Sequence, residues 1–189
     1  MSVLTRAQID LLLGQRSITE LPPWNSNDEA AVDAFYREAC AALMCETGTQ
    51  SRIEWDHYGS GYASFVDAWF YRPEPAFKSR IPFTYTHGHT GLIVLLSRLS
   101  PYFVMMEGDK GWGERNAASY LPDAREADRL HTAAVRELAA RMQPLLEARG
   151  LVRLRGADLA QPLPAGLAVP TILGDPPYTV FDALFYWED

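Results

Sequence analysis

Cysteine is scarce in this sequence, and no apolar run is long enough to span a membrane. Cys40 and Cys45 are the only cysteines among 189 residues. They lie five residues apart in one expected helix, so we expect two reduced thiols on different faces of that helix, as in a cytosolic protein. The chain opens without a basic-then-apolar leader, and Leu92–Leu96 is too short to cross a bilayer. These features favour a cytoplasmic protein without a membrane partner.

The motifs of common enzyme classes are missing too. The sequence has no G-x-S-x-G elbow, and neither cysteine has a histidine at a spacing known from cysteine enzymes. Gly108, Gly111 and Gly113 are not followed by the G-K-[ST] of a phosphate-binding loop. The sequence therefore predicts no catalytic residue and no cofactor, and it favours a binding protein over an enzyme.

Positive charge is the minority charge. The 24 acidic residues outnumber the 17 lysines and arginines, which gives a net charge of −7 and a pI near 5.1. This balance argues against binding to nucleic acid or to an anionic membrane, and it suits a basic protein partner. A hydrophobic content of 48% and an aromatic content of 12% are typical of a folded chain with a substantial core.

Hydrophobic periodicity predicts an α+β fold in which two main helices pack on a mostly antiparallel sheet. Apolar residues three or four positions apart predict helices at residues 28–46 and 122–149. Alternating or continuous apolar runs predict strands at residues 52–58, 62–72, 102–107 and 178–187. Because helices and strands segregate along the chain, we expect a single α+β domain over residues 1–189.

The longest apolar region begins at Leu92 and ends in a glycine-rich segment. Leu92–Leu99 fits either a strand or a helix, and we favour a helix because four leucines share one helical stripe. The run Tyr102–Met106 predicts a strand buried on both faces. The glycines at 108–113 then predict a loop at the end of that strand.

Seven residues are candidate contacts to a basic protein partner. The predicted loop would project a tryptophan with acids around it, and tight interfaces are often anchored on such a tryptophan. The strand at 52–58 and the aromatic, acidic C-terminus each add an acidic pair. The candidates are Glu107, Asp109, Trp112, Glu54, Asp56, Glu188 and Asp189.

His87 and His89 form the alternative candidate site. Two histidines at i and i+2 share one face of an extended backbone, and His57 is a further nitrogen ligand elsewhere in the chain. The H-x-H pair resembles part of the cupin metal motif, but the acid that should follow it is missing. We therefore expect no metal, and a small metal- or ligand-dependent enzyme using this region is the alternative function.

Two segments share the pattern apolar-Asp-Ala-apolar-Phe-Tyr, at residues 66–71 and 181–186. We interpret them as two neighbouring strands under the same packing demand. Asp67 and Asp182 would then lie within a sheet, where a carboxylate needs a partner. Arg72, Arg98 or a backbone amide could supply it.

As a whole, the sequence resembles a small bacterial immunity protein of the polymorphic, contact-dependent toxin type. The resemblance is carried by a compact acidic α+β chain with many aromatic residues, no catalytic motif, and the terminal segment Phe185–Asp189. It implies a cytosolic antidote that neutralises a cognate antibacterial toxin by direct contact, often by blocking the active cleft of the toxin. Acidic groups would speed the encounter with a basic cleft, and aromatic groups would supply affinity.

Overall fold

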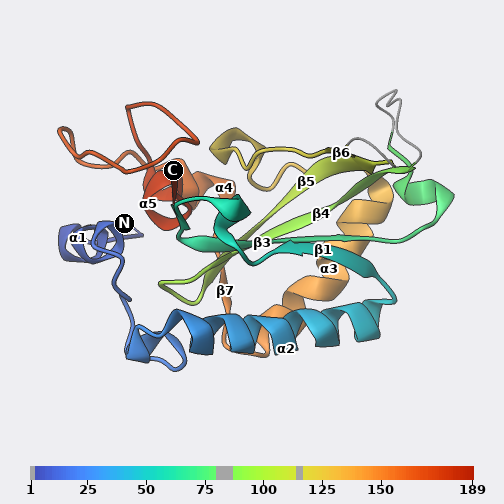
Figure 1. Cartoon of the computed structure of the whole chain (residues 1–189), viewed down its shortest axis with the longest axis horizontal. Coiled ribbons are helices and arrows are strands. Elements are labelled where there is room, and N and C mark those ends of the chain that lie inside the picture. Colours follow the sequence, from blue (N-terminus) through green and yellow to red (C-terminus); the bar gives the residue numbers. More distant parts are fainter. Residues whose placement is uncertain (1–2, 80–86, 114–116) are drawn as a thin grey trace.

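A curled sheet forms the centre of the protein (Figure 1). The structure, a computed structural model, describes residues 3–79, 87–113 and 117–189. The strand order is β1-β3-β4-β5-β6, with β7 beside β5, and every pairing except β5–β7 is antiparallel. The strands are β1 (Gln50–Glu54), β3 (Phe65–Tyr71), β4 (His87–Ser97), β5 (Tyr102–Trp112), β6 (Ala117–Ala118) and β7 (Val152–Arg153). A second, two-stranded sheet pairs β2 (Tyr62–Ala63) with β8 (Trp187–Glu188).

Two long helices, α2 and α3, lie along one face of the sheet (Figure 1). Contacts to α2 from β1 and from the residue after it identify that face: Ser51 donates to the sulfur of Met44, and the Arg37 guanidinium lies 4.1 Å from the centre of the Trp55 ring. The helices are α1 (Arg6–Leu13), α2 (Glu29–Thr47), α3 (Ala133–Glu147), α4 (Gly156–Leu159) and α5 (Val180–Leu184), with short 3-10 turns η1 (Trp24–Ser26), η2 (His57–Gly59), η3 (Pro75–Phe77) and η4 (Ala124–Glu126). The predicted fold class, an α+β fold with a mostly antiparallel sheet on two main helices, is confirmed.

The helix predicted at residues 28–46 is confirmed, whereas the one predicted at 122–149 begins eleven residues late, at Ala133. Asp28 caps α2 by accepting from the Ala30 amide, and Gly48 ends it in a left-handed conformation. Before α3, Asp128 has a φ of 63°, which no helix tolerates. Its carboxylate accepts hydrogen bonds from Arg153 and from the Gly156 amide, so tertiary contacts hold this break open.

The helix favoured at Leu92–Leu99 is wrong, because these residues lie in β4, between β3 and β5. Leu92 and Val94 point to the same face as the helices, while Ile93 and Leu95 point to the opposite face. All four are buried. A central strand that is covered on both faces carries a continuous apolar run, and such a run happens to include leucines at helical spacing.

The strand predicted at residues 178–187 is also wrong, because the middle half of this segment forms α5 and only Trp187 lies in a strand, β8. Thr179 and Asp182 make a capping box, in which Asp182 accepts from the backbone amide and the hydroxyl of Thr179. The repeated hexapeptide therefore forms a strand in one place and a helix in the other, and the two copies are not neighbouring strands. Local capping decides the second copy against the shared apolar pattern.

The C-terminal segment covers one end of the main-sheet face that lies opposite to α2 and α3. The Phe185 ring lies 6.2 Å from the Phe65 ring, and the Tyr186 hydroxyl donates to the Leu12 carbonyl of α1. Both α1 and α5 lie at this end of the molecule in Figure 1. The other end of the same face, around β5 and β6, is not covered by a helix in the described part of the chain. None of the described helices combines the length and the apolarity that a membrane crossing requires.

Candidate functional site

Strand alternation separates the three residues predicted to share a loop. The segment 108–113 continues β5 as far as Trp112, so the predicted loop is wrong. Glu107 accepts from the amide and the hydroxyl of Thr132 at 2.8 and 2.7 Å, and Asp109 accepts from the Thr90 hydroxyl at 2.6 Å. Both acids point to the face that α2 and α3 cover, whereas Trp112 points to the opposite face. A role of Glu107 or Asp109 in partner binding stays a prediction.

Trp112 belongs to an aromatic cluster, which we define as Trp69, Tyr71, His89 and Trp112. The Trp112 ring lies 6.2 Å from that of Trp69, 5.7 Å from Tyr71 and 5.5 Å from His89. The Arg52 guanidinium lies 4.0 Å from the centre of the Trp112 ring. Arg52 comes from β1 and Trp112 from β5, with two strands between them. Their contact shows that the sheet curls around this cluster.

Two glycines make room for aromatic rings on this face. A Cβ atom added to Gly91 would lie 2.5 Å from the Trp69 ring and 2.6 Å from the Phe70 carbonyl oxygen. A Cβ atom added to Gly108 would lie 2.6 Å from the Tyr120 ring. The Trp69 indole nitrogen also donates to the Gly108 carbonyl at 2.9 Å. Glycines in the interior of a strand thus permit close ring packing here and do not mark a turn.

Asp67 is buried on the same face and accepts hydrogen bonds from two tyrosines. The Tyr58 hydroxyl donates at 2.9 Å and the Tyr120 hydroxyl at 2.7 Å. Burial raises the pKa of Asp67, while Lys110 and the two tyrosine hydroxyls oppose that shift. Neither arginine expected as a partner contacts Asp67, since Arg72 donates to the Thr47 carbonyl and Arg98 to the Asp33 carboxylate. The third expected partner, a backbone amide, is found for Asp182, which accepts from the Thr179 amide.

A hollow of about 350 Å³ opens above this layer, between β1, β5 and the segment after β5. We call it the Lys110 pocket. The Lys110 ammonium lies 4.8 Å from the centre of the Tyr120 ring and 5.9 Å from that of Trp69. Burial lowers the pKa of Lys110, and the nearby Asp67 and Glu54 carboxylates oppose that shift. Its lining comprises Arg52, Ile53, Glu54, Lys110, Gly111, Trp112 and residues 117–119.

Three of the acids proposed as partner contacts, Asp56, Glu188 and Asp189, lie in segments that come together at one edge of the fold. The β2–β8 pairing sets Tyr62 opposite Glu188, and the Tyr58 and Trp187 rings are 4.4 Å apart. The turn that holds Asp56 therefore adjoins the C-terminus. Glu29 joins this edge through His57, whose Nε2 atom lies 2.9 Å from the Glu29 carboxylate. We call this edge the acidic margin and define it as Glu29, Asp56, Glu188 and Asp189.

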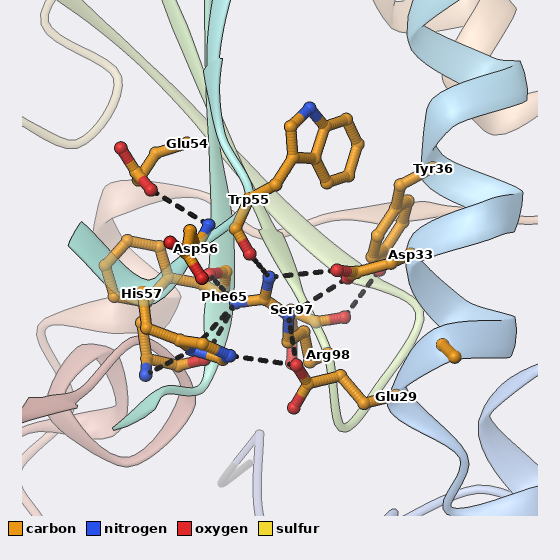
Figure 2. A network of polar contacts seen from close by, with 12 residues as sticks. Glu29, Asp33, Tyr36, Glu54, Trp55, Asp56, His57, Phe65, Ser97 and Arg98 are labelled. Carbon is orange, nitrogen blue, oxygen red and sulfur yellow. Dashed lines mark hydrogen bonds and ion pairs between the residues drawn. The ribbon is translucent and has the colours of Figure 1, made fainter. Parts of the chain in front are cut away.

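A buried arginine holds the segments beneath the acidic margin together (Figure 2). Arg98 donates to the Asp33 carboxylate at 3.0 and 3.2 Å and to three backbone carbonyls at 2.7 to 3.0 Å. A guanidinium has five N–H donors, so each one has an acceptor here. The carbonyls belong to Trp55, Ala63 and Phe65. Helix α2, the end of β1 and the start of β3 are thereby fixed to one another.

The three histidines of the alternative metal site lie in different environments. His57 contacts Glu29, and its Nδ1 atom accepts from the Ala63 amide. His87 and His89 instead stack on the Trp112 ring. Burial lowers the pKa of His89, and the charge of His87 adds to that effect. Within residues 3–79, 87–113 and 117–189, no three His, Cys, Asp or Glu side chains are grouped so that they could hold a metal ion.

Two of the predicted contact residues, Glu54 and Trp112, line the Lys110 pocket, and three others form part of the acidic margin. Sequence reasoning missed Lys110 and Tyr120, and it singled out Asp67 only as a carboxylate that needs a partner. The available signal was the alternation within residues 107–112, which places Lys110 and Trp112 on one strand face. In comparisons with known proteins, no family model matches the chain, and no curated protein or solved structure matches it.

Proposed function

We propose that this protein is a cytoplasmic immunity-type antidote that neutralises a cognate antibacterial toxin by direct protein–protein contact at the acidic margin. The observation that carries the proposal is that the β2–β8 pairing and the contact between the Tyr58 and Trp187 rings bring the turn that holds Asp56 beside the segment of Glu188 and Asp189, which is far away in the sequence. A basic cleft on the toxin is the complementary surface. Acids gathered at one edge accelerate encounter with such a partner.

The acidic margin also has the aromatic groups and the rigidity that an interface needs. Trp187 and Tyr62 are partly exposed beside the acids, and partly buried aromatic side chains are frequent anchors of tight complexes. Arg98 donates to the Trp55 carbonyl, next to Asp56, and forms an ion pair with Glu29, so it fixes the positions of both acids. A pre-organised surface loses less conformational entropy when it binds, so the same contacts yield a higher affinity.

Charge reversal at the margin tests this proposal. The double variant Asp56→Lys/Glu188→Lys is compared with Glu38→Lys/Glu137→Lys, which makes the same charge change at exposed positions of α2 and α3. The test partner is a toxin domain sought among the proteins encoded next to this chain, and the readouts are protection of toxin-expressing cells and the association rate. We expect the margin variant to associate at least about tenfold more slowly at low salt and to protect poorly.

The control variant should associate and protect as the wild type does. Equal loss in both variants would show that only net charge matters, and it would remove the acidic margin as the interface. Failure of the wild type to bind the neighbouring toxin domain or to protect against it would overturn the immunity function itself.

A further inference from the structure

The Lys110 pocket contains two cations whose hydrogen-bond donors have no acceptor in the part of the chain that the structure describes. No hydrogen bond joins the Lys110 ammonium or the Arg52 guanidinium to any acceptor in residues 3–79, 87–113 or 117–189, and each cation instead faces an aromatic ring. Arg98 differs, because all five of its donors have acceptors. Lys110 and Arg52 therefore have donors to offer to a group that enters the hollow.

The acids near the pocket are engaged elsewhere. One oxygen of Glu54 accepts from the backbone amides of Asp56 and Tyr58, at 2.9 and 3.2 Å. Both oxygens of Asp67 accept from tyrosine hydroxyls. These contacts direct the two carboxylates toward the turn and the sheet, whereas the cations face the hollow. An acceptor with negative charge is the group that the remaining donors favour.

The wall of the pocket favours a flat apolar body. Trp112 lines the hollow, and the alanines of β6 lie at its rim. Near the pocket, Gly91 and Gly108 let the Trp69 and Tyr120 rings pack close to the strands. A volume of about 350 Å³ is at the small end of the range for ligand pockets, which suits a molecule with one or two rings.

We propose that the Lys110 pocket binds a small aromatic carboxylate, with its carboxylate on Lys110 and Arg52 and its ring against Trp112. This site is separate from the acidic margin, and the proposal does not depend on the immunity function. A cationic aromatic amine held by Glu54 is the opposing possibility, and the experiment below distinguishes the two.

Three indole compounds that differ only in the polar group provide the probes: indole-3-acetate, indole-3-acetamide and tryptamine. Binding to the wild type, to Lys110→Met and to Lys78→Met is measured by calorimetry. Methionine keeps an unbranched apolar stem and removes the charge. Lys78 and Lys110 are the only lysines in the sequence, and Lys78 is exposed, so it provides the matched control.

We expect indole-3-acetate to bind the wild type and Lys78→Met equally, and to bind Lys110→Met at least about tenfold more weakly. The amide and the amine should bind the wild type at least about tenfold more weakly than the acid does. The proposal is overturned if tryptamine binds most tightly, if Lys110→Met keeps full affinity for the acid, or if none of the three probes binds.

A second measurement covers the case in which Lys110→Met does not fold. Wild-type protein is acetylated with and without saturating indole-3-acetate, and both lysines are followed by mass spectrometry. Bound acid should slow the acetylation of Lys110 and leave that of Lys78 unchanged. Equal acetylation of Lys110 with and without the acid would overturn the proposal.

Discussion

The two faces of the sheet are built on different principles. Most of the face beneath α2 and α3 is lined by aliphatic and phenylalanine side chains, including Val66, Phe70, Val94 and Leu96, and Glu107 and Asp109 lie only toward the Trp112 end of β5. The opposite face carries tryptophan and tyrosine rings, a buried carboxylate, a lysine and two glycines that fit the rings. One face needs volume and apolarity, whereas the other needs particular atoms in particular places.

This difference predicts how each face responds to substitution. Apolar cores tolerate swaps that conserve volume, because dispersion and burial depend little on the exact shape of the side chain. A face held by polar partners and close ring contacts tolerates fewer substitutions, since each buried hydroxyl needs its acceptor. Unequal sensitivity of this kind is expected where a protein has built a binding surface on one side of a structural sheet.

The largest effect is expected from the smallest chemical change, Gly91→Ala. The added methyl group would lie 2.5 Å from the Trp69 ring and 2.6 Å from a backbone oxygen, so the ring or the strand must move. We expect a loss of about 3 kcal/mol in the free energy of unfolding, measured by urea denaturation. Gly174→Ala, where the nearest atom would be at 3.4 Å, is the control and should change stability little. A cost below about 1 kcal/mol for Gly91→Ala would show that the ring cluster is loosely packed.

A smaller, pH-dependent effect is expected for Asp67→Asn. The amide disturbs one of the two tyrosine hydrogen bonds, and we expect a cost of about 2 kcal/mol at pH 4. Because burial raises the pKa of Asp67 in the folded protein, the wild type loses stability as pH rises through that pKa, and the asparagine variant does not. The cost of the substitution should therefore shrink from pH 4 to pH 8. Asp175→Asn, an exposed substitution, is measured in parallel, and a cost that grows with pH would contradict this assignment.

On the helix-covered face, Leu92→Met should cost only about 1 kcal/mol, although Leu92 is fully buried. Methionine has nearly the same volume and adapts to irregular space, so the packing can be retained. Urea denaturation again gives the free energy of unfolding. A cost as large as that of Gly91→Ala would mean that the two faces are equally demanding, and the comparison between them would fail.

The same contrast explains which parts of the fold the sequence predicts. Helix α2 follows from period and capping, and the strand character of β1 and β3 follows from their apolar residues, all of which are local signals. The strand β4 does not, because a run such as Leu92–Leu96 has a helical stripe and a strand-like composition at once. The choice between helix and strand depends on the tertiary structure, in which both faces of this strand are covered. In α5 the decision is again local, because the capping box at Thr179 and Asp182 starts a helix. The repeated apolar pattern nevertheless favours a strand when the sequence is read alone.

The candidate site shows the limit more sharply. The sequence can suggest Glu54 and Trp112 as contact residues because of their residue types. Their shared pocket, however, depends on the curl of the sheet that brings β1 near β5. The hydrogen bonds of Asp67 join β3 to Tyr58 and Tyr120, and Tyr120 is 53 residues away in the sequence. Glycines within β4 and β5 have the composition of a turn, and only the rings lying on them reveal their role.

The smallest effect concerns the acetylation of Lys110. It tests whether the charges of Lys110 and Asp67, on the sheet face opposite to α2 and α3, are coupled. The neutral amine of lysine is the form that reacts with an acetylating reagent, so the pH at which acetylation reaches half its plateau reports the pKa of that amine. Burial lowers the pKa of Lys110, so its midpoint should lie below the ordinary lysine value of about 10.4. Limited access to the reagent lowers the plateau rate and leaves the midpoint unchanged. Lys78 reacts in the same tube and reports decay of the reagent.

The Asp67→Asn variant completes this test. The charge of Asp67 raises the pKa of Lys110, so removing it should move the Lys110 midpoint to still lower pH and leave Lys78 unaffected. Asp109→Asn is the matched control, since Asp109 belongs to the same sheet but points to the helix-covered face. A shift of the Lys110 midpoint in Asp109→Asn as large as in Asp67→Asn would show that the two faces are not electrostatically separate. No shift in either variant would show that Asp67 and Lys110 are not coupled.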